Sequence, residues 1–421
     1  MTAESAAAPR RKWWSGGLLP GLQKVGRSLQ LPVAVLPAAG MLVSLGVLLN
    51  AYLHGPFWDK LSDILLKGGG GILDPKLGLP LLFCIGVAIG FAKKSDGSTA
   101  LAAVAGFLVY HNVLKAFPVA GSVTKVLPEG EPQNPGVLGG ILIGLLTATI
   151  WQRYHRTRLV DWLGFFNGRR LVPIIMALVC CVLGVVFGLL WQPVGAALEW
   201  FGKQLIDLGA WGAGLFGVAN RLLIPVGMHQ FLNVFFWFQA GEYTTPTGTV
   251  VQGDLTRFLA GDPNAGQFMS GFFPIMMFGL PAAALAITHC ARPEHRKRVA
   301  GLMFSVALTS FVTGVTEPLE FSFMFAAPLL YGLHALLTGA SMAITWALGV
   351  HAGFSFSAGV IDYIVYWHLD TKPWLIIPIG ACFAVVYYVL FRVLITAFDI
   401  PTPGREPEEL EKELEEGQTK P

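Results

Sequence analysis

The sequence predicts an all-α polytopic membrane protein, with about ten transmembrane helices and additional re-entrant hairpins. Hydrophobic residues make up 54% of the 421 residues and charged residues only 13%, whereas an average soluble domain carries about 25% charged residues. The mean hydropathy is +0.59. Charge also gathers at the chain ends, with six charged residues in the first 29 and ten in residues 404–421. The central part of the chain is therefore suited to lipid rather than to water.

Ten apolar stretches approach the length of about 20 residues that a helix needs to cross the hydrocarbon core of a bilayer. In chain order they are Leu31–Leu53, Leu77–Ala92, Thr99–Phe117, Gly136–Trp151, Leu171–Trp191, Gly209–Val226, Met228–Ala240, Phe272–Cys290, Ala326–Ala347 and Trp374–Phe398. The fourth stretch contains Gly136, Gly140 and Gly144, a spacing of small residues that lets helix backbones approach closely in lipid. We expect this spacing to serve helix packing or a dimer contact.

The positive-inside rule predicts the orientation of these helices. Four basic loops should mark the cytoplasmic face: Arg10–Lys12, Lys93–Lys94, Arg153–Arg170 and Arg292–Arg298. Both termini then lie in the cytoplasm. Residues 1–29 are expected to form a cytoplasmic segment with an amphipathic helix over Leu18–Gln30. Residues 401–421 are expected to form an acidic cytoplasmic tail with seven Glu.

Composition and spacing exclude several classes of site. The net charge of +3 comes from scattered basic residues, so we expect no nucleic-acid partner. The five Cys lie in apolar stretches without a C-x-x-C spacing, so we expect neither a disulfide nor a metal site. The glycine run Gly68–Gly71 lacks the order of a phosphate-binding loop. No cofactor is expected.

Polar residues inside apolar sequence are the candidates for function, because ionised groups are costly at membrane depth. In the first cluster, Pro225 and Gly227 interrupt a helix and free backbone groups for other partners. Four polar residues surround this break: Arg221, His229, Gln230 and Asn233. Taken singly, Arg221 could extend to the interface and His229 could be a core histidine. Four such residues around one break favour a binding site.

The second cluster is Thr313–Phe321, which carries Thr316, Glu317 and Glu320 in an apolar region without Lys or Arg. Pro318 disfavours the helical conformation at the residue before it, so Glu317 is expected to project from a non-helical turn. We predict that Glu317 contacts a substrate. For Glu320 two roles are open: substrate contact, or a structural role in capping a half-helix or pairing with Arg221.

A third, weaker cluster contains His351 and Phe354 and lies in a stretch of small, hydroxyl and aromatic residues. It suits a re-entrant hairpin over a cavity and equally a tight helix contact. Together the clusters offer carboxylate, imidazole, amide and hydroxyl groups beside aromatic rings. Sugar hydroxyls need both donors and acceptors, and carboxylates are strong acceptors. A neutral polyol fits this set best.

At these motifs the chain resembles the membrane permease (enzyme IIC) component of the phosphoenolpyruvate-dependent sugar phosphotransferase system, in its glucose/N-acetylglucosamine branch. The resemblance covers nearly the whole chain and is most specific at Gly314–Phe321 (GVTEPLEF). Three motifs resemble the N-acetylglucosamine-specific type: Gly227–Asn233 (GMHQFLN), Phe268–Leu280 (FMSGFFPIMMFGL) and His351–Tyr363 (HAGFSFSAGVIDY). The glucose type tends to carry a second histidine where Gln230 stands.

The resemblance implies a homodimer in a bacterial cytoplasmic membrane, with a scaffold half at residues 30–205 and a mobile sugar-binding half at residues 206–400. It implies that His229 and Glu317 hydrogen-bond the sugar, with Arg221 and Thr316 nearby. N-acetylglucosamine would be carried inward and phosphorylated at its 6-hydroxyl by a phosphocysteine of a IIB domain. Many relatives carry that domain after the acidic linker, whereas this sequence ends at Pro421. We therefore expect a separate IIB protein as the phosphoryl donor.

Three alternatives stay open, the first of them within the family that the chain resembles. A glucose-specific permease of the same branch differs only in specificity, and Gln230 is the residue expected to discriminate the acetamido sugar. A proton-coupled sugar transporter would use Glu317 or Glu320 as the proton carrier. A membrane-embedded enzyme acting on glycosides is disfavoured, because its carboxylates would need to lie at a wet face.

Overall fold

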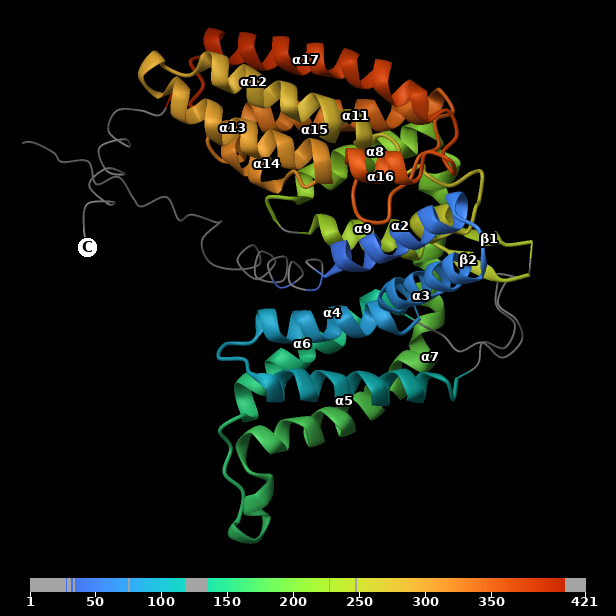
Figure 1. Cartoon of the computed structure of the whole chain (residues 1–421). Helices are drawn as coiled ribbons and strands as arrows, with labels where there is room; N and C mark the ends of the chain where they lie inside the picture. The colour runs from blue at the N-terminus through green and yellow to red at the C-terminus, as the bar shows by residue number, and fades with distance from the viewer. Residues whose placement is uncertain are drawn as a thin grey trace, which may run out of the picture.

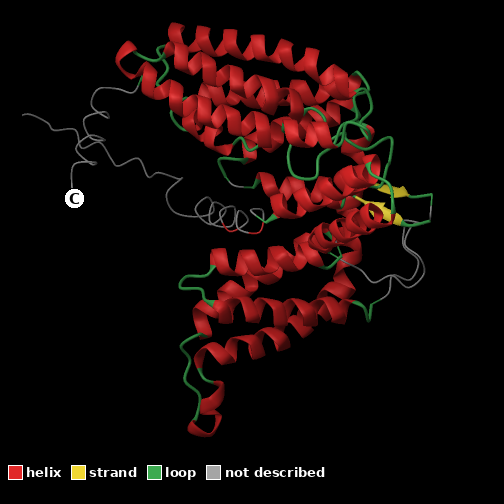
Figure 2. Ribbon diagram, in the orientation of Figure 1, coloured by secondary structure: helices red, strands yellow, loops and turns green. Residues whose placement is uncertain are grey.

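A computed structural model describes residues 28, 32, 35–74, 76–117, 135–226, 228–246 and 248–405. The described chain is almost entirely helical (Figure 2), which confirms the predicted fold class. Six of its helices are long and apolar enough to cross a membrane, or seven if the bent pair α3 (Pro56–Leu73) and α4 (Gly78–Phe91) forms one span. The predicted amphipathic helix at 18–30 and the acidic tail lie largely outside the described residues.

Helices α4, α5 (Gly97–Leu114), α6 (Gly136–Tyr154) and α7 (Leu171–Asp207) form the lower body of the molecule (Figure 1). The small residues of α6 make its packing against α4 possible. A Cβ added at Gly140 would lie 2.1 Å from the carbonyl oxygen of Pro80, and one at Gly144 would lie 2.6 Å from that of Cys84. The expectation that this glycine spacing serves helix packing is confirmed.

The upper body in Figure 1 holds α8 and most of the later helices. These are α8 (Ala210–Leu223), α11 (Phe272–Pro274), the π-helical turn η3 (Ile275–Gly279), α12 (Leu280–Cys290), α13 (Pro293–Thr313), α14 (Glu317–Met324), α15 (Pro328–Ala347), α16 (Val360–Val365), η4 (Pro373–Leu375) and α17 (Ile376–Ala397). Helix α13 was not among the ten predicted spans. Its first turns carry Glu294, Arg296, Lys297 and Arg298, and these charges lower its hydropathy.

Between the two bodies lie α2 (Leu36–Tyr52), α3 and α9 (His229–Phe238) (Figure 1). The hairpin of β1 (Glu242–Thr244) and β2 (Val250–Gln252) and the short helix α10 (Asp254–Leu259) follow α9. Earlier in the chain, η1 (Asp161–Phe166) and η2 (Gly168–Arg170) connect α6 to α7. Neither the β-hairpin nor these 3₁₀ turns were predicted.

Among the described residues, the number of full-length spans is smaller than the ten expected, because several predicted stretches form shorter helices. The stretches 209–226 and 228–240 become α8 with 14 residues and α9 with 10 residues. The helix is interrupted between them at residues 224–226 and 228, where Pro225 cannot continue it. The predicted interruption is confirmed, and each piece is shorter than a membrane span.

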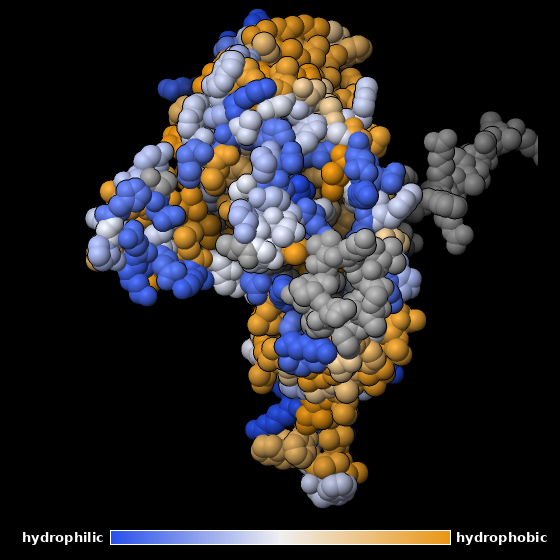
Figure 3. Space-filling model, turned by 90° about the vertical axis from the view of Figure 1, so that its right-hand side faces the viewer, coloured by the Kyte–Doolittle hydropathy of each residue, from blue (hydrophilic) through white to orange (hydrophobic). Residues whose placement is uncertain are grey.

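Hydrophilic side chains gather at one end of the helix bundle, and apolar side chains flank them above and below (Figure 3). This distribution fits a multi-pass membrane protein with its helix ends in water and its sides in lipid. Within the molecule, α2 contacts the residues that precede and follow α16. The hydroxyl of Ser44 lies 2.9 Å from that of Ser355 and 3.1 Å from that of Tyr366.

Candidate functional site

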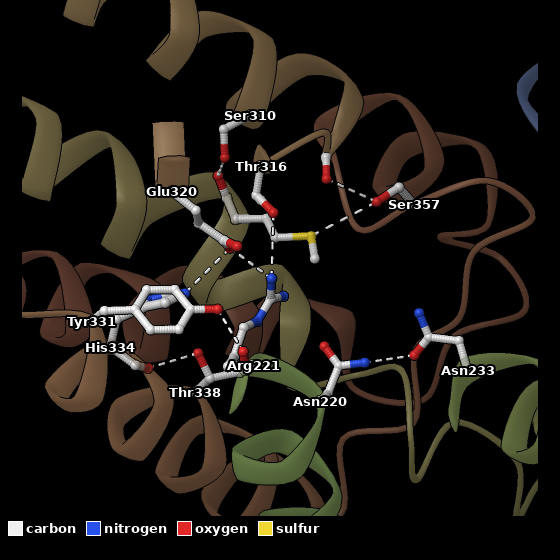
Figure 4. A network of polar contacts seen from close by, with 12 residues as sticks. Asn220, Arg221, Asn233, Ser310, Thr316, Glu320, Tyr331, His334, Thr338 and Ser357 are labelled. Carbon is white, nitrogen blue, oxygen red and sulfur yellow. Dashed lines mark hydrogen bonds and ion pairs between the residues drawn. The ribbon is translucent and has the colours of Figure 1, made fainter. Parts of the chain in front are cut away.

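A buried ion pair joins the first two sequence clusters (Figure 4). Nη1 of Arg221, in the last turn of α8, lies 2.6 Å from Oε1 of Glu320 in α14. The same nitrogen donates to the hydroxyl of Thr316 at 3.3 Å. The side chains of Arg221 and Glu320 are 3% and 0% exposed. Glu320 thus has one of the structural roles left open by the sequence, since it neutralises Arg221 inside the protein.

Four aromatic or imidazole side chains lie at or next to this ion pair. His334 of α15 places Nε2 3.2 Å from Oε1 of Glu320, and its Nδ1 lies 2.8 Å from the hydroxyl of Tyr387 in α17. The hydroxyl of Tyr331 donates to the backbone carbonyl of Arg221. The Arg221 guanidinium stacks over the ring of Phe272 at 5.0 Å. A buried ion pair is tolerated only when such additional partners satisfy it.

Sequence reasoning missed His334, although the same cost argument could have found it. It is a fully buried polar residue on an apolar helix, but it lies outside the three clusters selected from the sequence. Tyr331, Tyr387 and Phe272 gave no comparable signal, because aromatic residues are common in apolar helices.

The backbone before α14 explains how the carboxylates reach the site. Helix α13 ends at Thr313 and is followed by Gly314, whose φ of 73° is a left-handed conformation that favours glycine. Ser357 donates from its hydroxyl to the Gly314 carbonyl at 2.9 Å. The expectation of a non-helical turn at Glu317 is wrong, because Glu317 is the first residue of α14. Pro318 is accommodated in the first helical turn, where a backbone N–H has no intrahelical acceptor.

His229 and Glu317 flank the ion pair. His229 is the first residue of α9, after the interruption of the helix at Pro225, and is 9% exposed. Glu317 is half-buried. The charges of Arg221 and Glu320 act electrostatically on both residues. The structure therefore brings the first and second clusters together. In the described part of the chain, Glu317 forms no ion pair.

Three buried polar atoms in this cluster lack a hydrogen-bond partner among the described residues: Nε of Arg221, Nδ1 of His229 and Oε2 of Glu320. Buried polar atoms are nearly always paired, and each unpaired one costs about 1–3 kcal/mol. Two donors or potential donors and one acceptor are thus unpaired in the described part of the chain. This pattern suits a molecule that carries several hydroxyl groups.

An amide chain runs beside the ion pair. Nδ2 of Asn220 donates to Oδ1 of Asn233 at 2.6 Å, and Nδ2 of Asn233 donates to Oε1 of Gln230 at 3.3 Å. Asn220 belongs to α8, and the other two residues belong to α9. The chain therefore bridges the helix break and connects the neighbour of Arg221 with the neighbour of His229. Asn220 was not among the residues singled out from the sequence.

The third cluster is held by contacts within the protein. His351 forms an isolated backbone bridge with Thr371, and its Nδ1 lies 3.2 Å from the Ala265 carbonyl oxygen. Phe354 is 1% exposed and packs edge-on against Trp237 at a centroid distance of 5.2 Å. The stretch is non-helical at residues 352–359 and packs within the protein, and sugar contact by His351 and Phe354 stays a prediction. Within the described residues, no three His, Cys, Asp or Glu side chains form a group that could hold a metal ion.

A carboxyl group in the loop before η4, outside the candidate membrane spans, contacts the third cluster. Oδ1 of Asp370 accepts a hydrogen bond from the backbone N–H of Gly353 at 3.2 Å, while its Oδ2 has no partner among the described residues. Burial raises the pKa of the Asp370 carboxyl from 3.8 to about 8. At neutral pH Asp370 is therefore largely protonated in the folded protein.

Residues 26–339 match the family model described as Phosphotransferase system, EIIC. The chain belongs to this EIIC family. The family resemblance seen in the motifs is thereby confirmed, and the buried cluster of Arg221, Glu320, His229 and Glu317 lies within the matched residues. In this EIIC protein the four side chains come from α8, α9 and α14.

Among curated relatives, the N-acetylglucosamine-specific EIIC component of Streptomyces coelicolor is 64% identical over 98% of this chain and 99% of its own length. The N-acetylglucosamine-specific EIICB component of Bacillus subtilis is 45% identical, with 95% of this chain and 82% of that protein covered. The N-acetylglucosamine-specific EIICBA component of Escherichia coli is 47% identical over 95% of this chain, which spans only 58% of that protein.

One solved structure also aligns with this EIIC chain. ChbC, the IIC component from the N,N'-diacetylchitobiose-specific phosphotransferase system, has a TM-score of 0.48 and 14% identity, with 88% of this chain and 94% of that chain covered. This likeness is too distant to locate individual residues.

Proposed function

We propose that this EIIC protein is the N-acetylglucosamine permease of a sugar phosphotransferase system, which carries the sugar inward for phosphorylation by a IIB protein. The observation that carries the proposal is the near full-length identity of 64% to an N-acetylglucosamine-specific EIIC component. The cluster of unpaired buried donors and acceptors around Arg221 supports it, because a sugar would satisfy these atoms.

The site residues divide into two groups in this proposal. His229 and Glu317 hydrogen-bond the sugar, since Nδ1 of His229 has no partner among the described residues and Glu317 forms none of the described ion pairs. Arg221, Thr316 and Glu320 hold the site in shape through their mutual contacts. Orientation of the 6-hydroxyl toward the cytosolic donor is then the contribution of this chain to phosphoryl transfer.

The assembly is part of the proposal as well. We place residues 30–205 in a scaffold half that forms a homodimer and residues 206–400 in the half that moves with the sugar. Both termini lie in the cytoplasm of a bacterium, on the side of the phosphorylated IIB protein. The basic loops support this orientation, because Arg153–Arg170 and Arg292–Arg298 lie at helix ends.

Uptake of radiolabelled N-acetylglucosamine into cells lacking their own transporters tests the proposal. Cells with this chain and the phosphotransferase proteins, IIB included, should accumulate N-acetylglucosamine 6-phosphate, and omission of IIB should abolish this product. Accumulation of free sugar that stops when the proton gradient is collapsed would favour a proton-coupled transporter instead. Uptake of glucose at the same rate as N-acetylglucosamine would show that the permease is not specific for N-acetylglucosamine.

A further inference from the structure

The amide chain Asn220–Asn233–Gln230 has a direction. Oδ1 of Asn233 accepts from Asn220, so the Nδ2 of Asn233 faces Gln230 and donates to its Oε1. Each amide has one oxygen end and one NH₂ end. Since the oxygen of Gln230 points to Asn233, its NH₂ group points away from the chain. That NH₂ group forms no hydrogen bond within the described residues.

The chain also has an anchor and an open end. Asn220 and Asn233 are 2% and 5% exposed, whereas Gln230 is half-buried. Gln230 follows His229 in the first turn of α9, and His229 is the residue with an unpaired buried Nδ1. The unpaired NH₂ of Gln230 and the unpaired nitrogen of His229 therefore belong to adjacent residues at the edge of the site.

We infer that Asn220 and Asn233 are positioning residues that turn the Gln230 amide so that its NH₂ donates to the acetamido carbonyl of the sugar. This inference rests on the proposed function and adds how the site recognises the group that distinguishes N-acetylglucosamine from glucose. A carbonyl oxygen accepts hydrogen bonds and cannot donate them, so it needs a donor opposite. A hydroxyl group can do both and adapts to either end of an amide.

Three sugars with different groups at carbon 2 probe this direction. N-acetylglucosamine presents a carbonyl acceptor, glucose presents a hydroxyl, and glucosamine presents an ammonium group with donors alone. The wild-type site should prefer them in that order. An acceptor in place of the Gln230 NH₂ should weaken the binding of N-acetylglucosamine and strengthen the binding of glucosamine. The affinity for glucose should stay nearly unchanged.

Two substitutions create such an acceptor by different routes. Gln230→Glu replaces the NH₂ directly. Asn233→Asp still accepts from Asn220 but offers only oxygen to Gln230, so the Gln230 amide must rotate and present Oε1 to the sugar. Asn112→Asp in α5 is the matched control, because Asn112 is exposed and far along the chain from the site.

Binding of the three sugars is measured by isothermal titration calorimetry on the purified full chain in detergent. Gln230→Glu and Asn233→Asp should each raise the dissociation constant for N-acetylglucosamine about tenfold, which corresponds to the loss of one hydrogen bond. The dissociation constant for glucose should stay within about threefold of the wild-type value. In a Gln230→Ala background, Asn233→Asp should leave the preference for N-acetylglucosamine over glucose unchanged, since it acts through Gln230.

The inference would be overturned if both single variants kept the wild-type preference for N-acetylglucosamine over glucose. It would also be overturned if the variants lost affinity equally for all three sugars. Gln230→Glu at the half-buried end keeps the test decisive if Asn233→Asp fails to fold. A wild-type chain that binds no N-acetylglucosamine would instead reject the proposed function.

Discussion

Glu317 and Glu320 are three residues apart, and the structure predicts opposite consequences for the same substitution at each. Glu320→Gln removes the only negative charge in ion-pair contact with the buried Arg221 among the described residues. Loss of one partner from a buried ion pair destabilises a protein by about 3–5 kcal/mol, because the remaining charge is left uncompensated. Glu320→Gln should therefore lower the free energy of unfolding by about this amount.

Glu317→Gln should affect binding instead. Glu317 is half-buried at the start of α14 and forms no ion pair in the described part of the chain. The substitution should therefore change the free energy of unfolding of the protein by less than about 1 kcal/mol. In the proposed site its carboxylate accepts from sugar hydroxyls, and a hydrogen bond to a charged group contributes about 1.5–3 kcal/mol. The dissociation constant for N-acetylglucosamine should rise about tenfold to a hundredfold.

The assay combines thermal unfolding in detergent, followed by tryptophan fluorescence, with calorimetric binding of N-acetylglucosamine. Glu294→Gln, at an exposed position in the first turn of α13, is the matched control and should change neither quantity. The reasoning is refuted if Glu317→Gln unfolds as early as Glu320→Gln, or if Glu320→Gln keeps wild-type stability.

Three further changes test the surroundings of the site. Gly314→Ala should destabilise the protein by more than about 1 kcal/mol in thermal unfolding, because its φ is 73° and an added Cβ would lie 2.6 Å from Oγ of Ser357; wild-type stability would contradict the packing described. Tyr387→Phe leaves Nδ1 of His334 without its partner at 2.8 Å and should cost about 1–3 kcal/mol, measured in the same way, whereas Tyr388→Phe on the neighbouring, half-exposed position should cost less. Asp370→Asn should gain stability relative to wild type as the pH rises: the folded-state pKa of about 8 lies above the ordinary 3.8, so wild type loses stability as pH increases through this range. A stability difference independent of pH between 5 and 9 would contradict that pKa.

The cost of polar groups in lipid was sufficient to select from the sequence several residues that the structure brings together. Arg221 and His229 lie four residues on either side of Pro225, and Glu317 lies directly before Pro318 almost 100 residues later, all in apolar sequence. The pairing of Arg221 with Glu320 could only be named as one alternative, because spacing along the chain does not fix which buried charges meet.

Other features depend on tertiary packing and lay beyond the sequence. Hydropathy alone could not show that α8 and α9 are too short to span, since apolar composition continues through the break at Pro225. The direction of the amide chain depends on how Asn220 and Asn233 face each other across that break. Periodicity also gave no sign of the hairpin β1–β2, whose strands have only three residues each.

The position of bound sugar tests the central claim most directly. Cryo-electron microscopy of the full chain in lipid nanodiscs with N-acetylglucosamine should show the sugar against both Glu317 and His229, with its acetamido group beside Gln230. Sugar density that contacts neither Glu317 nor His229 would contradict the account.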